Sequence, residues 1–182
     1  MRNIFFLPVL FLFLSMQAVS QQNKVIRRPS IQVGAQASLA VGDLAETNGA
    51  GLGAHVLGTY PVAKSTSLTG RLSYTYLFGK KYSHDYYVDP GGSGGSYSGK
   101  YDGMSDIGLT VGARQHLNDN WFAGLEGGLC FDLGGEHSET AGMGSVEVGY
   151  DIWTKLAQSI ALYFGLCGDP KIQIGLRYSI RL

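Results

Sequence analysis

The chain ends in the stretch IQIGLRYSIRL, residues 172–182, in which every second residue from Ile172 to Leu182 is apolar. The residues between them, from Gln173 to Arg181, are polar or glycine without exception. Side chains of a β-strand point alternately to opposite faces, so a period of two predicts a strand with one apolar face. Because the alternation continues to the last residue, we expect the chain to end inside a sheet.

Seven further stretches show the same alternation, which predicts eight strands in all. They are expected at 31–41, 51–62, 67–79, 105–117, 121–133, 144–152 and 156–166, upstream of the last strand at 172–182. The connections alternate between tight turns, at 63–66, 118–120 and 153–155, and mostly longer segments, at 42–50, 80–104, 134–143 and 167–171. Outer-membrane barrels have an even number of antiparallel strands, short periplasmic turns and longer outward loops. We therefore expect an up-and-down arrangement with both termini in the periplasm.

The polar face of these strands separates a membrane barrel from a soluble, lipocalin-like barrel, which turns its apolar face inward. The expected strands contain no lysine, and their polar face is rich in Gly, Ser and Gln, which suits a narrow lumen filled by side chains. All nine charged residues of the expected strands lie on this face: Arg71, Asp106, Arg114, Glu126, Asp132, Glu147, Asp151, Arg177 and Arg181. The sequence thus predicts an all-β, eight-stranded antiparallel up-and-down transmembrane β-barrel whose apolar face contacts outer-membrane lipid.

The first twenty residues are expected to be a targeting segment rather than part of the barrel. Arg2 precedes a short apolar run, and small residues stand before Gln21, so residues 1–20 are typical of a signal peptide removed after Ser20. Residues 21–30 then form a polar periplasmic lead-in, and residues 31–182 form the barrel. The whole chain carries 14 basic and 14 acidic residues, so it offers no basic field for nucleic acid.

Several short motifs give the chain a family resemblance. They are Val41-Gly42-Asp43, Gly51-Leu52-Gly53, Tyr60-Pro61, the strand from Leu72 to Tyr76, and the final Gly175 to Tyr178. With them the sequence resembles the small outer-membrane β-barrel family of Bacteroidota, the porin-family or OmpX-like barrels. The resemblance implies a surface location and no single shared reaction.

The last strand is also where we expect the barrel assembly machinery to recognise the chain. The expected assembly signal is Gly175, Tyr178, Ile180 and Leu182, although the chain ends in leucine where this family usually has a closing aromatic residue.

The long segment 80–104 is the expected surface for recognition. It is rich in tyrosine and glycine, a combination that suits adaptable contacts. Its tyrosines are Tyr82, Tyr86, Tyr87, Tyr97 and Tyr101, with a glycine-rich run at 91–95. The alternative is a flexible exposed loop without a ligand.

Two other functions compete with a structural or binding barrel. A lipid A-modifying hydrolase would draw on Glu136, His137, Ser138 and Glu139, or on His84 with Asp85, but neighbours within one loop do not fix a nucleophile beside its base. A narrow small-solute pore conflicts with a lumen just wide enough for side chains. We expect no catalytic residue, cofactor or metal site, with His55 and His116 as polar lumen residues.

The lumen should hold a structural network formed by Arg71, Arg114, Glu126, Glu147 and Arg177. The turn at 118–120 sets Gly112 opposite Glu126 and Arg114 opposite Gly124, which makes Arg114 and Glu126 diagonal neighbours and expected partners.

The two cysteines, Cys130 and Cys167, fall on the lumen face at the outward ends of two strands that have a third between them. A disulfide needs Cα atoms within about 7 Å, so we expect free thiols, although the compartment permits a bond.

Overall fold

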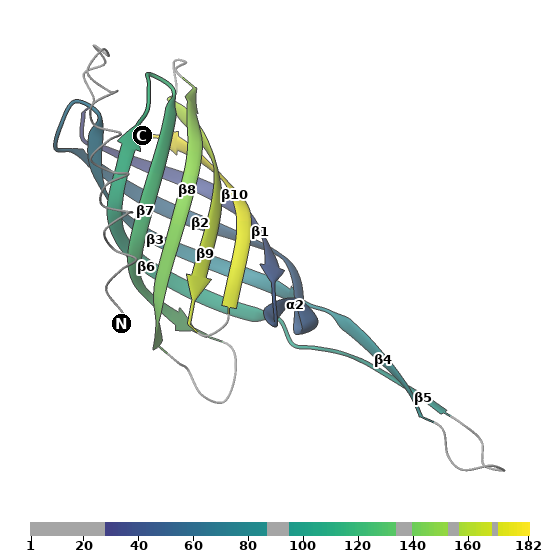
Figure 1. Ribbon diagram of the computed structural model, residues 1–182. Coiled ribbons are helices and arrows are strands. Elements are labelled where there is room, and N and C mark those ends of the chain that lie inside the picture. The colour runs from purple at the N-terminus through teal and green to yellow at the C-terminus, as the bar shows by residue number, and fades with distance from the viewer. Residues whose placement is uncertain (1–27, 87–94, 134–139, 153–156, 169–170) are drawn as a thin grey trace, which may run out of the picture.

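The computed structural model describes residues 28–86, 95–133, 140–152, 157–168 and 171–182. Within them, eight strands close into one antiparallel barrel (Figure 1). These strands are β1 (Ser30–Val41), β2 (Asn48–Pro61), β3 (Thr66–Gly79), β6 (Met104–His116), β7 (Trp121–Asp132), β8 (Thr140–Ile152), β9 (Gln158–Cys167) and β10 (Lys171–Arg181). Each strand pairs with its neighbour along the chain, and β1 pairs with β10 to complete the ring. The predicted eight-stranded up-and-down barrel is confirmed.

The last strand closes the barrel, as the alternation up to the final residue requires. Ala37 of β1 lies opposite Leu176 of β10, and the same register continues from Gln32↔Arg181 to Val41↔Ile172. Beyond β10, the N–H of Leu182 donates to the carbonyl of Ile31 at 3.0 Å. A closed sheet leaves no strand edge unpaired, so the barrel needs no water to satisfy its backbone.

The barrel has its polar side chains inside and its apolar side chains outside. On β10, Leu176 is 55% exposed and the adjacent Arg177 is 3% exposed. The same contrast holds around the ring, where the outward leucine, isoleucine, valine and aromatic side chains are exposed and the inward serine, threonine, glutamine and charged side chains are buried. This polarity is the reverse of that of a water-soluble protein and suits an apolar solvent around the barrel.

One end of the barrel carries the tight turns. The N–H groups of Val62 and Ala63 both donate to the carbonyl of Thr66, and the N–H of Leu117 donates to the carbonyl of Trp121. The Asn118 side chain accepts from the N–H groups of two following residues, which fixes the three-residue turn 118–120 as expected.

Exposed aromatic rings gather toward both ends of the outer surface. The Trp121 ring meets that of Tyr150 edge to face at 5.2 Å on the turn side, and Tyr76 meets Phe78 in the same way near the other end. Paired aromatic rings at two levels are typical of the girdles that flank the apolar band of a membrane barrel.

The end opposite the tight turns carries two elements that the sequence interpretation left as loops. Residues 42–50 include the short helix α2 (Leu44–Thr47), and β2 begins at Asn48. Residues 80–104 include the hairpin β4 (Lys81–Tyr86) and β5 (Gly95–Lys100), which projects well beyond the barrel rim (Figure 1). Within the described part of the chain, no helix has the length and hydropathy needed to cross a bilayer.

We expect the folded protein to resist detergent denaturation and to migrate differently on gels before and after boiling. A closed barrel has no unpaired edge at which detergent could begin to open the sheet. Electrophoresis of heated and unheated samples measures this directly. A detergent-independent, water-soluble monomer of residues 21–182 would contradict the membrane barrel.

Candidate functional site

The centre of the lumen is occupied by one carboxylate bound by three arginines. Glu147 of β8 accepts from Arg71 at 2.8 Å, from Arg114 at 2.8 Å and from Arg177 at 3.2 Å. Glu147 is 3% exposed, and each of the three arginines is at most 4% exposed. The donors come from β3, β6 and β10, so a single side chain connects strands from different sides of the barrel.

A second carboxylate, Glu126 of β7, completes the network. One of its oxygens accepts from Arg71 at 2.9 Å, and the other accepts from the Thr110 hydroxyl at 3.0 Å. All five residues that we expected in the lumen network therefore lie in it. The predicted pairing of Arg114 with Glu126 is wrong, because Arg114 binds Glu147 and Glu126 binds Arg71.

Two glycines explain why Arg114 does not pair with its diagonal neighbour Glu126. The predicted register is correct, with Gly112 opposite Glu126 and Arg114 opposite Gly124. Gly124 also lies opposite Glu147, whose side chain fills the space above it, so Glu147 reaches across β7 toward Arg114. Glu126 fills the space above Gly112 in the same way and reaches toward β3. Each glutamate therefore extends over a glycine of the adjacent strand and binds an arginine on the strand beyond it. Glu147 binds Arg114 of β6, and Glu126 binds Arg71 of β3.

Three arginines against two glutamates leave one positive charge in excess within this network. Two aromatic rings lie beneath the guanidinium groups, with Arg114 3.9 Å from the Phe122 ring centroid and Arg177 3.8 Å from that of Tyr163. Aromatic faces attract cations, most strongly where water is excluded. We did not predict either ring from the sequence. Each could have been recognised as a large aromatic residue at a position of its strand that otherwise carries polar or small side chains.

Several other lumen residues form polar pairs of their own. His55 Nε2 lies 2.8 Å from the Ser179 hydroxyl, and His116 Nε2 lies 3.4 Å from a carboxylate oxygen of Asp151. Toward the hairpin end, a cavity of only about 20 Å³ remains among the lumen side chains, room for a water molecule. Among the described residues, no group of three or more His, Cys, Asp and Glu side chains could hold a metal ion.

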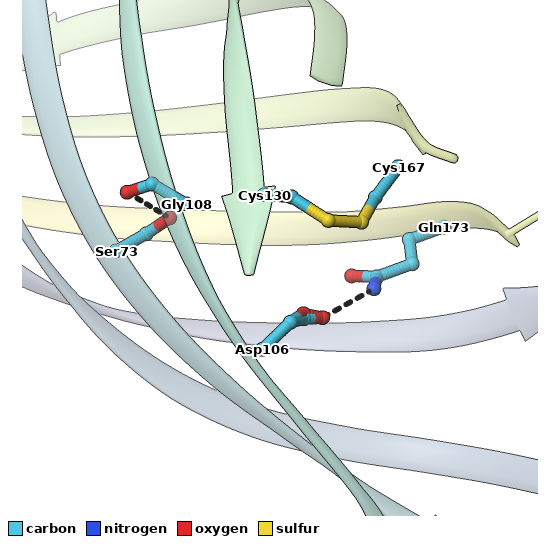
Figure 2. Close-up of a disulfide and its surroundings, with 6 residues drawn as sticks. All are labelled: Ser73, Asp106, Gly108, Cys130, Cys167 and Gln173. Carbon is cyan, nitrogen blue, oxygen red and sulfur yellow. Dashed lines mark hydrogen bonds between the residues drawn. A yellow bond between two sulfur atoms is a disulfide. The ribbon is translucent and has the colours of Figure 1, made fainter. Parts of the chain in front are cut away.

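The two cysteines are bonded to each other, so the expectation of free thiols is wrong. Cys130 of β7 and Cys167 of β9 form a disulfide with their Cα atoms 6.0 Å apart. Figure 2 shows this bond beside the Gln173–Asp106 hydrogen bond of 3.1 Å. The expectation assumed the strand spacing of a flat sheet, in which two intervals separate Cα atoms by about 9.5 Å. In the structure, Cys130 lies opposite Ala141 of the intervening strand β8, which has a small side chain, and Cys167 lies opposite Met143 of the same strand.

Of the five tyrosines that we singled out, three have side chains that the structure describes: Tyr82, Tyr97 and Tyr101. The Tyr82 ring centroid lies 5.9 Å from that of Tyr97 and 4.7 Å from that of Tyr101. A hydrogen bond with Tyr97 raises the pKa of Tyr82 above its ordinary value. The backbone of Tyr86 belongs to β4, and Tyr87 lies outside the described residues.

The other predicted site residues are placed as follows. Gly175, Tyr178 and Ile180 lie on β10, and Leu182 follows it, so the expected assembly signal is the strand that closes the barrel. The hydrolase candidates Glu136, His137, Ser138 and Glu139 fall outside the described residues. The backbone of His84 and Asp85 lies in β4.

The closed eight-stranded ring, its polar filled lumen and its apolar outer face define the class of the fold: that of a small outer-membrane β-barrel. No protein-family model and no curated protein sequence matches this chain. By structure it is similar to Ail, the attachment invasion locus protein of Yersinia pestis, solved in complex with the heparin analogue sucrose octasulfate. The two share 14% sequence identity with a TM-score of 0.50, over 86% of this chain and 100% of Ail. At this identity, the likeness concerns the fold.

We expect Arg114 to be energetically coupled to Glu147 more strongly than to Glu126. Removing one partner of a buried ion pair strands the other charge and costs on the order of 3–5 kcal/mol, whereas removing both costs less. The measurement is urea unfolding of the refolded barrel in detergent for Arg114→Leu, Glu147→Gln, Glu126→Gln and the two double variants with Arg114→Leu. The exposed Glu46, substituted to Gln, is the control. Coupling in the Glu126 cycle that equals or exceeds coupling in the Glu147 cycle would show the described partners to be wrong.

We expect no thiol to react with a labelling reagent in the denatured, non-reduced protein, and both cysteines to react after reduction. The bond spans a sequence separation of 37 residues. The chain-entropy model for a loop of that length gives a loss of about 4 kcal/mol in unfolding free energy for Cys130→Ser with Cys167→Ser. Mass spectrometry of the labelled protein and urea unfolding measure the two effects. Labelling before reduction would refute the disulfide.

Proposed function

We propose that this protein is an integral outer-membrane barrel that exposes the β4–β5 hairpin on the cell surface and uses it for binding. The observation that carries the proposal is the combination of an apolar exterior with a hairpin that projects past the rim (Figure 1). Exposed apolar surface over the whole barrel wall needs lipid around it, whereas a hairpin of Tyr, Ser, Gly and Lys needs water.

The orientation follows from the distribution of turns. In outer-membrane barrels the short turns face the periplasm and the longer connections face outward. The turns at 62–65 and 117–120 lie at the end where β10 finishes, and the hairpin lies at the other end. We therefore infer that the C-terminus is periplasmic and the hairpin extracellular, after export by a signal peptide at residues 1–20.

The terminal strand supports assembly in the outer membrane. Tyr178 and Ile180 alternate with polar residues on β10, which pairs with both β9 and β1. A strand that closes the ring is a suitable signal for the barrel assembly machinery. The sequence motifs support membership of the Bacteroidota family of small barrels.

The lumen supports a structural barrel rather than a pore. The ion pairs of Glu147 and Glu126 join strands across the barrel centre, and the cavity beyond them is about 20 Å³. Among the described residues, this filling of the lumen favours a packed interior over an aqueous path. We propose a non-enzymatic role, in which the barrel is the anchor and the hairpin is the part that contacts other molecules.

A deletion that leaves the barrel intact tests the proposal. The N–H of Tyr101 donates to the carbonyl of Lys80 at 2.9 Å, so these residues face each other at the hairpin base. Removing 81–100 and joining Lys80 to Tyr101 through Asn-Gly should replace the hairpin with a two-residue turn. We expect cells with the deletion variant to lose adhesion to a panel of immobilised polysaccharides, matrix proteins and cultured epithelial cells.

Two measurements keep the result interpretable. The heat-dependent gel shift should be the same for the full chain and for the deletion variant, because the hairpin is outside the closed ring. Trypsin added to intact cells should cleave the full chain within the hairpin, at Lys81 or Lys100, and should spare Lys64 in the turn at the opposite end. Unchanged adhesion of the deletion variant, or cleavage at Lys64 in intact cells, would contradict the proposed function.

A further inference from the structure

The β4–β5 hairpin has two chemically different faces. Residues directly opposite each other on antiparallel strands share a face. Lys81 lies opposite Lys100, Ser83 opposite Ser98 and Asp85 opposite Ser96, so one face carries hydroxyl groups, the two lysines at the hairpin base and one acidic residue toward the tip. Two ammonium groups directly across from each other also repel, which makes this the face that would attract an anion.

The other face is aromatic. Tyr82 lies opposite Gly99, while Tyr97 and Tyr101 are each two positions from Gly99 and therefore point to the same side. A side chain at Gly99 would collide with the ring of Tyr82, so the glycine is what allows this ring to lie across the ribbon onto β5. Tyr82 thereby sits between the other two rings, and we call these three residues the tyrosine strip.

The strip is exposed on its outer side. Tyr97 is 61% exposed and Tyr101 is 37% exposed, while their rings remain within 6 Å of the Tyr82 ring. Contacts between the rings stabilise the two-stranded ribbon, but those contacts use only part of each ring. The rest of the Tyr97 and Tyr101 surface faces solvent.

The base of the hairpin is held against the barrel rim, so the strip has a fixed support. The N–H of Lys80 donates to the carbonyl of Thr47 at 2.8 Å, and its ammonium donates to the carbonyl of Ala45 in α2. Gly79 permits a close approach of the Tyr101 backbone that a Cβ would block. A surface that is ordered before binding loses less entropy when it binds.

We propose that the tyrosine strip binds uncharged carbohydrate chains, with sugar rings stacked on the tyrosine rings. This inference rests on the proposed surface-binding function and names its ligand class. The C–H face of a pyranose ring is apolar and flat enough to stack on an aromatic ring, and the phenol hydroxyls can exchange hydrogen bonds with the sugar hydroxyls. Among the described residues, the register places one lysine, Lys80, and one histidine, His84 opposite Tyr97, on this face, and the Lys80 ammonium donates to the carbonyl of Ala45. A polyanion would instead match the lysine face.

The test measures binding of the detergent-solubilised full chain to immobilised uncharged polysaccharides, namely glucans, mannans, galactans and chitin fragments. Sucrose octasulfate and a proline-rich peptide serve as anionic and peptide probes. The strip variants are Tyr97→Ala, Tyr101→Ala and Gly99→Val, the last of which displaces Tyr82 without removing a ring. Lys81→Gln with Lys100→Gln is the matched control on the opposite face, and the heat-dependent gel shift checks folding of every variant.

We expect the protein to bind at least one uncharged polysaccharide, with each strip variant weakened by about ten-fold or more, the effect of truncating an aromatic anchor. The lysine variant should bind as tightly as the full chain, at low and at high salt. Binding of sucrose octasulfate or of the peptide alone would overturn the inference, as would loss of binding in the lysine variant. If no uncharged polysaccharide binds while the hairpin deletion still abolishes adhesion, this inference fails and the proposed function stands. If the deletion leaves adhesion unchanged, both fail.

Discussion

The carboxylate of Glu147, bound by Arg71, Arg114 and Arg177, is the interaction on which the barrel interior depends. A barrel surrounded by lipid must place its polar side chains inside, where little water is available to solvate them. A buried charge is tolerated only when it is paired and its hydrogen bonds are satisfied. Glu147 pairs with arginines from different parts of the ring, so its loss would remove the carboxylate partner of Arg114 on β6 and of Arg177 on β10, and would leave Arg71 on β3 with Glu126 alone.

The glycines of β6 and β7 make that arrangement possible. An eight-stranded lumen has room for side chains but not for a large side chain at every inward position. Gly112 and Gly124 leave gaps into which Glu126 and Glu147 extend. The direction in which each glutamate leans then decides which arginine it meets. Small residues on the polar phase are therefore as important to the network as the charges themselves.

The strands could be predicted because their signal is local, whereas the lumen partners and the disulfide could not. Alternation along each strand gives both the strand and its inward face, and the turn at 118–120 gives the register of β6 with β7. The partner of Arg114 depends on how far Glu147 leans across Gly124, and the Cys130–Cys167 bond depends on how closely β7 and β9 approach each other across β8. Neither property can be predicted from the spacing of residues along one strand.

The hairpin was missed for a different reason, and that reason bears on its function. Residues 81–86 and 95–100 do alternate in pattern, but their tyrosines, serines and glycines have no apolar core to face, so the stretch resembles a loop. An isolated two-stranded ribbon is marginally stable in water. Here the anchoring of Lys80 to α2 and the contacts among Tyr82, Tyr97 and Tyr101 supply the missing support. The charged residues at the centre of the lumen thus pair with one another, while the hairpin presents exposed tyrosine rings outside the barrel wall.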